Sequence, residues 1–167
     1  MLPSKLRDMN IFQDGFSFRG VASEVSLPKL AKKMASYRGN LLGNLKFFDG
    51  IEDLEMEWTA SGFSLEAYKA FGKVTVDGVQ LRYVGAYQNP QTGAVQAVEV
   101  TVRGQHEEID SGAQKVGDDD TTKIKTTLSY YKLTVDNQDV IEIDILNSVF
   151  VVDGVDVYAE IRNAVGG

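Results

Sequence analysis

Two carboxylates set two residues apart, Glu142 and Asp144, have the spacing in this sequence that most directly suggests chemistry. In a strand, residues i and i+2 share a face, so both carboxylates would project together, with isoleucines on the opposite face. Paired carboxylates can act as general acid and base in glycoside hydrolysis. A sugar cleft is not otherwise indicated, because the one tryptophan is Trp58 and no third polar group accompanies the pair. A charged, non-core face of a sheet is the better interpretation.

The one histidine, His106, and the acidic run "GDDDTTK" at 117–123 are the other candidates for chemistry. The segment "RGQHEEID" lies between a strand and a polar loop, so we expect an exposed, structural histidine. The acidic run lacks the D-x-[DN]-x-[DN]-G spacing and the later Glu of a calcium loop, which favours a solvated turn. There is no cysteine, Walker loop or G-x-G-x-x-G pattern. The sequence therefore predicts no enzyme, no catalytic or metal residues and no cofactor.

The composition indicates an ordinary folded chain. It has 167 residues, of which 43% are hydrophobic and 25% charged, enough for a single domain over 1–167 with a real core. The start, "MLPSKLRDMNIF", is polar, and no apolar run approaches the roughly 20 residues that span a bilayer. We therefore expect no signal peptide, no membrane insertion of the monomer and folding in a cytoplasm.

Most of the chain has the period-2 pattern and turn residues of β-strands. Frequent glycine, scarce proline and Asp-Gly pairs at 14–15, 49–50, 77–78 and 153–154 predict many tight turns between these strands. The predicted strands of the main sheet, within 79–146, are "VQLRYVGAY" (79–87), "AVQAVEVTVRG" (94–104), "TKIKTTLSYYKLTV" (122–135) and "DVIEIDIL" (139–146).

One segment, 64–72, predicts a short helix. Ser64 is the candidate N-cap, and Leu65, Tyr68 and Phe71 recur at threes, so they should form one apolar stripe that packs on a sheet. The tail "VDVYAEIRNAVGG" could form a second short helix.

Charge is distributed unevenly along the chain. The net charge is −7, yet residues 1–48 carry a net +5 and residues 49–167 a net −12. Blocks of charge are often no more than solvated surface. The sharper interpretation is that copies attract one another head to tail, which builds rings or filaments.

The stretch "SLPKLAKKMASYRG" (26–39) can be read as a basic amphipathic helix or as one strand of a hairpin. The acidic, alternating segment "FDGIEDLEMEWTA" (48–60) follows it after "RGNLLGN". Opposite charges across two antiparallel strands would favour pairing, so an extended hairpin over 26–60 is the better fit. The residues we expect at subunit interfaces are Lys29, Lys32, Lys33, Tyr37, Arg38, Asp49, Glu52, Asp53, Glu55 and Glu57.

A series of short motifs in a fixed order gives the chain a family resemblance. An early D-G and G-V precede L-P-K-L and Y-R, and later come S-Y-Y-K-L, E-I-D, D-G-x-D-x-Y-A and R-N. In these motifs the sequence resembles the major tail tube proteins of contractile-tailed phages and the tube proteins of R-type pyocins, over nearly its whole length. The resemblance implies a mainly β fold, a single-domain β-sandwich or barrel-like sheet with one short helix and the extended hairpin.

The resemblance also implies function and partners. Six copies would form rings that stack into the rigid inner tube of a contractile tail or tailocin, assembled in the host cytoplasm. The partners implied are the sheath outside, a tape-measure protein and DNA inside, and baseplate and tail-terminator proteins at the ends. Glu142 and Asp144 are candidates for an acidic channel wall that repels DNA.

Two alternatives stay open at this point. The tube proteins of type VI secretion share the architecture. A free-standing β-barrel that binds a ligand is a different class, and it predicts a stable monomer with a pocket.

Overall fold

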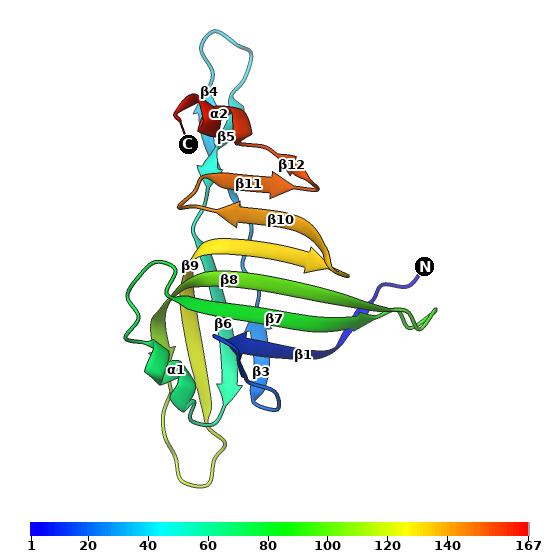
Figure 1. Cartoon of the computed structure of the whole chain (residues 1–167), viewed down its shortest axis with the longest axis vertical. Coiled ribbons are helices and arrows are strands. Elements are labelled where there is room, and N and C mark those ends of the chain that lie inside the picture. The colour runs from blue at the N-terminus through cyan, green and yellow to red at the C-terminus, as the bar shows by residue number, and fades with distance from the viewer. Residues whose placement is uncertain (167) are drawn as a thin grey trace.

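The computed structural model describes residues 1–166, which form a mainly β structure with two short helices (Figure 1). The mainly β fold predicted from the sequence is confirmed, and the C-terminal helix is present. The elements are β1 Lys5–Gln13, β2 Phe16–Ser17, β3 Ala22–Ser26, β4 Lys32–Tyr37, β5 Leu45–Ile51, β6 Leu54–Ser61, α1 Leu65–Ala70, β7 Val79–Gln88, β8 Val95–Asp110, β9 Thr121–Val135, β10 Gln138–Asp144, β11 Val149–Val152, β12 Val155–Asp156 and α2 Ala159–Ala164.

The main sheet is an antiparallel ladder in the order β12-β11-β10-β9-β8-β7-β1-β2. β6 pairs with β9 and β3 pairs with β6, so the ladder branches into a second layer. In Figure 1 the strands β7 to β11 lie like rungs, while the β3–β4 and β5–β6 segments run along the long axis across them.

The two layers share β8 and β9, which change partners along their length. The C-terminal half of β9 pairs with β10, and its N-terminal half, from Thr121 to Leu128, pairs with β6. The β8–β9 register shifts at Arg103/Gly104 and again at His106/Glu108. Gly104 was predicted to end a strand, but β8 continues to Asp110 through this corner.

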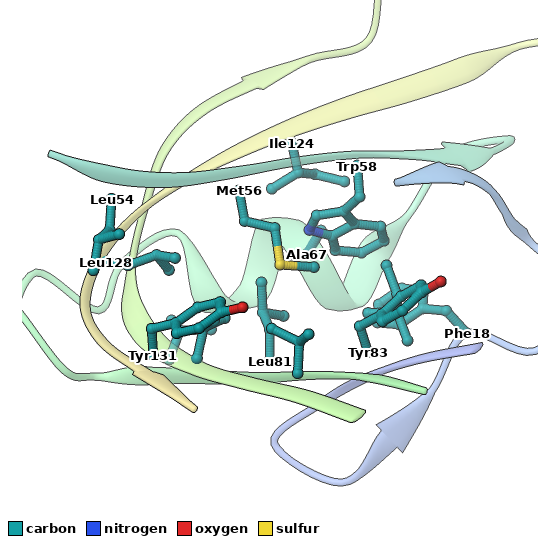
Figure 2. Packing of buried hydrophobic residues seen from close by; sticks show 14 of the residues in the cluster. Phe18, Leu54, Met56, Trp58, Ala67, Leu81, Tyr83, Ile124, Leu128 and Tyr131 are labelled. Carbon is teal, nitrogen blue, oxygen red and sulfur yellow. The ribbon is translucent and has the colours of Figure 1, made fainter. Parts of the chain in front are cut away.

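The core lies between the two layers (Figure 2). Alternate residues of β6 are buried, and in Figure 2 Met56 and Trp58 face Leu81 and Tyr83 of β7. Met56, Leu81 and the buried valines of β8 are fully enclosed, and burying each such side chain contributes roughly 1.5–3 kcal/mol. The period-2 pattern therefore positions the core, as the sequence predicted for these strands.

The helix α1 covers one side of the core, but with a different face from the one predicted. Ala67 and Ala70 are its buried residues, whereas Leu65 and Phe71 are about half exposed. The small alanines let the helix backbone approach the core closely, which leaves the larger apolar residues outside. Ser64 occupies the N-cap position without a side-chain capping hydrogen bond.

Turn chemistry explains the tight connections of the ladder. Asp14 and Gly15, and Asp153 and Gly154, both have positive φ at adjacent positions, as a type I′ hairpin turn requires. The predicted turn at Asp49-Gly50 is wrong, because that pair lies inside β5, with Gly50 at φ 120°.

Candidate assembly surfaces

The segment 26–60 contains a projecting hairpin. β4 pairs with β5 antiparallel, in a register that sets Met34 opposite Phe48 and Tyr37 opposite Leu45, so the helical alternative for this stretch is wrong. These two strands form a separate two-stranded sheet, and their loop reaches beyond α2 at one end of the molecule (Figure 1). An isolated two-stranded ribbon gains little stability by itself.

The hairpin carries cations and exposed apolar groups together. Residues 27–48 contain Lys29, Lys32, Lys33, Arg38 and Lys46 and no acidic residue. All five cations are exposed, and within residues 1–166 none of them forms an ion pair. The large exposed apolar side chains of the hairpin are Met34, Tyr37, Leu41, Leu42, Leu45 and Phe47.

The basic and acidic segments pair with each other as predicted, since Lys32 lies opposite Ile51 and Ser26 of β3 lies opposite Glu57 of β6, but within residues 1–166 no ion pair joins their charges. β4 ends its register at Lys32 opposite Ile51, so the acids at 52–57 lie past the end of β5. Glu55 and Glu57 instead belong to β6, where Lys125 of β9 lies opposite Glu57 and forms an ion pair with Glu55 at 3.6 Å. The acids that we expected beside the lysines, Asp49, Glu52, Asp53, Glu55 and Glu57, are all exposed.

Beneath the hairpin, its base packs on the ladder. Phe48 contacts Phe150 of β11, with ring centroids 5.7 Å apart, and an apolar groove lies between Leu30, Ile51 and the isoleucines of β10. One face of the ladder is therefore covered from β1 to β11, by α1, by β3 and β6, and by the hairpin base. Within residues 1–166, no second layer packs on the opposite face, which we call the open face.

Glu142 and Asp144 lie on the open face, as their two-residue spacing predicts, with Ile143 buried on the other side. Glu142 accepts a hydrogen bond from the Tyr130 hydroxyl at 2.6 Å, and Asp144 accepts one from the Asn147 side chain at 2.8 Å. Burial, followed by the bond to Glu142, raises the pKa of Tyr130, so the phenol keeps its proton and donates it.

Cations share this open face. The register places Arg82, Thr101, Lys132 and Glu142 on one cross-strand row, and Arg103 beside Tyr130 on the next. The face that holds Glu142 and Asp144, the two acids predicted for a channel wall, therefore carries both charges.

His106 is buried at 4% exposure, not exposed as its sequence context suggested. Its Nε2 lies 2.8 Å from Gln13 Oε1, which can only accept, so Nε2–H donates and the Thr126 hydroxyl donates to Nδ1 at 2.9 Å. Gln13 in turn donates to the Glu66 carbonyl at 2.9 Å, which ties α1 to the core. Burial lowers the pKa of His106 to about 4; Lys73 also lowers it and Asp14 opposes the shift.

This bonding assigns His106 a structural part, since both ring nitrogens are occupied within the protein. Among residues 1–166, no three His, Cys, Asp or Glu side chains are grouped so that they could hold a metal ion. None of the helices in this part of the chain is long and apolar enough to span a membrane.

Three comparisons place the chain. The model of a known family, phage tail tube protein FII, matches residues 3–166. This chain belongs to that family. The tail tube protein of Escherichia phage P2 is 41% identical over 99% of this chain and 98% of its own length. The major tail tube protein of Serratia phage KSP20 is 32% identical over 95% of this chain and 93% of its own length.

The fold is also found in a solved structure. A chain of the sheath/tube terminator of an extracellular contractile injection system, in its extended state, has a TM-score of 0.62 at 10% identity, over 80% of this chain and 98% of that one. At this identity the likeness shows the fold alone. The family match and the phage relatives identify the chain as a tube-forming structural protein of a contractile phage tail.

Sequence reasoning missed several residues that build these surfaces. The strand β1, which borders β7 along Lys5–Gln13, was read only as a polar N-terminus. Met9 and Ile11 are spaced two residues apart and both face the core, and this period-2 pattern could have predicted the strand from the sequence.

Proposed function

We propose that this protein forms six-membered rings that stack into the rigid inner tube of a contractile tail or tailocin. The observation that carries the proposal is the projecting hairpin, a basic and apolar ribbon on a tail tube chain. Exposed apolar groups beside cations that lack partners within the subunit suit a contact with another subunit. We place Lys29, Lys32, Lys33, Tyr37 and Arg38 in that contact.

The acids predicted for the interface suit a neighbouring copy better than the same chain. Asp49, Glu52 and Asp53 lie exposed at the hairpin base, close to Lys32 in the register but in no ion pair with it within residues 1–166, and away from Arg38 and Lys46 nearer the tip. A tip from one subunit and a base from the next would bring opposite charges together, a heterologous contact that repeats around a ring. Glu55 and Glu57 are already near Lys125, so their part would be smaller.

We propose that the open face lines the channel. The ladder has free edges at β1–β2 and at β12, and joining edges between subunits would close a barrel and protect both. In such a barrel the covered face, with α1, looks outward. Glu142 and Asp144 would then lie in the wall of the lumen.

The partners follow from this geometry. The surface around α1 would meet a sheath, the ring ends would meet baseplate and terminator proteins, and the lumen would hold a tape-measure protein and DNA. The sheath/tube terminator with the same fold supports the sheath and the terminator among these partners. The role is structural and not enzymatic, and assembly would take place in the host cytoplasm.

Negative-stain microscopy of the concentrated full chain tests the tube directly. The proposal predicts hollow tubes or stacked rings. A ligand-binding monomeric barrel, the rival class, predicts dispersed particles at every concentration, and that result would refute the tube.

A further inference from the structure

Three cations of the open face, Arg82, Lys132 and Arg103, are each engaged by a side chain of the same face, whereas Lys5, opposite Gln88 at the start of β1, forms no ion pair within residues 1–166. Arg82 lies 3.4 Å from Glu99 through Nη1 and Oε1, and its guanidinium stacks on the Phe12 ring at 4.4 Å. Lys132 lies 3.3 Å from the Asp139 carboxylate, which also accepts a hydrogen bond from Thr134 at 3.1 Å.

The third cation, Arg103, lies flat over Tyr130, with its guanidinium carbon 4.0 Å from the ring centroid. The hydroxyl of that ring donates to Glu142, so the Tyr130 ring, and not an ion pair within residues 1–166, links Arg103 to a carboxylate. Stacking covers one side of the guanidinium, and the raised pKa of Tyr130 keeps the hydroxyl as a donor.

Phosphate groups bind proteins through free Lys and Arg side chains, and the release of counterions drives that binding. A cation that already has a carboxylate within 4 Å offers less to a passing phosphate, and the same carboxylate repels it. The hairpin cations, in contrast, have no such partners within the described chain.

We propose that Glu99 and Asp139, by ion pairing with Arg82 and Lys132, and Glu142, by holding the Tyr130 ring over Arg103, mask these three cations so that this part of the open face does not bind DNA. The inference rests on the proposed function, in which this face lines the channel. Cations on this face pair with its acids and help to hold the strands in register. The same cations must be masked if a polyanion is to slide past the face without binding.

The test measures binding of a short double-stranded DNA to dispersed full-length subunits, which size exclusion separates from assembled tubes, by fluorescence anisotropy at low salt. The unmasked variant combines Glu99→Gln, Asp139→Asn and Glu142→Gln. The matched control combines Asp77→Asn, Asp119→Asn and Glu160→Gln, exposed acids that make the same change of net charge away from these cations.

The unmasked variant should bind DNA at least about tenfold more tightly than the wild type, with a log–log salt slope near −2 to −3 for about three phosphate contacts. The control should change binding much less. Adding Arg82→Gln and Lys132→Gln to the unmasked variant should remove the gain.

Equal gains in both triple variants would show an effect of net charge alone and overturn the inference, as would no gain in a folded unmasked variant. If the triple does not fold, the single changes Glu99→Gln and Asp139→Asn must each give part of the gain; no gain from either overturns it. Tube formation by the wild type is read separately by microscopy, so a failed tube proposal and failed masking give different results.

Discussion

An alanine methyl at Gly104 would overlap the backbone carbonyl oxygen of Thr127 on the neighbouring strand. This close approach lies where β8 shifts register against β9 and passes from one layer to the other. The corner that joins the open ladder to the core layer therefore depends on the absence of a side chain at residue 104.

Gly104→Ala should destabilise the protein by about 3 kcal/mol or more, since backbone, unlike a side chain, cannot move aside cheaply. In an ordinary strand the same change would leave the stability unchanged or raise it, so a loss of stability would identify the close approach at Gly104. Gly72→Ala is the control, because a methyl there meets nothing within 4 Å. Urea unfolding measures both; equal midpoints for the two variants would contradict the corner's role.

The stability should fall as pH drops from about 6.5 toward 4, because of His106. Its folded pKa, about 4, lies below the unfolded value of 6.5, so the native state binds fewer protons in this window. The stabilisation is complete above pH 6.5 and is lost as pH falls, up to about 3 kcal/mol.

Urea unfolding at pH 7, 6 and 5 of the wild type and His106→Gln measures this effect. The variant should be less stable at pH 7 and should show a flatter pH dependence. A variant as pH-dependent as the wild type would assign the effect to other groups.

The ion pair between Arg162 and Asp156 should hold α2 in place. Arg162 Nη2 lies 2.5 Å from Asp156, Nη1 donates to the Ser148 carbonyl at 3.0 Å, and the bond from Arg162 lowers the pKa of Asp156. Arg162→Gln should speed amide hydrogen exchange across 159–164 and leave β8 and β9 unchanged. Unchanged exchange in α2 would mean that packing alone holds the helix.

Reversal of charge at Lys32 and Lys33 to Glu should impair polymerisation and leave the subunit folded. Both lysines are exposed and lack intrachain ion pairs within residues 1–166, so the change breaks no ion pair of the folded subunit. The control reverses Lys69 and Lys115, surface lysines outside the hairpin, whose ion pairs are local. Pelleting and circular dichroism measure assembly and folding; normal tubes from the hairpin variant would count against its role.

The sequence predicted the features that local patterns determine, namely where most strands lie and which residues share a face. The strand at 122–135 is observed as Thr121–Val135, and the shared face of Glu142 and Asp144 follows from period 2 alone. It could not predict that β8 continues past Gly104, because a corner and a strand end use the same residue. His106 was expected to be exposed because the predicted strand ended at Gly104, which placed this histidine between that strand and a polar loop.

The sequence also could not predict which residues lie opposite the cations of the hairpin. Composition showed complementary blocks, but register decides which residues face each other, and here it pairs Lys32 with Ile51. The face of α1 was misjudged because Ala67 and Ala70, and not the larger Leu65 and Phe71, fit against the core.

The most direct test of this account is a cryo-EM reconstruction of tubes assembled from the purified chain. It should show six subunits per ring, the β4–β5 hairpin in contact with a neighbouring subunit, and the open face with Arg82 and Glu142 turned to the channel. Tubes whose hairpins touch no neighbour, or whose open face looks outward, would contradict it.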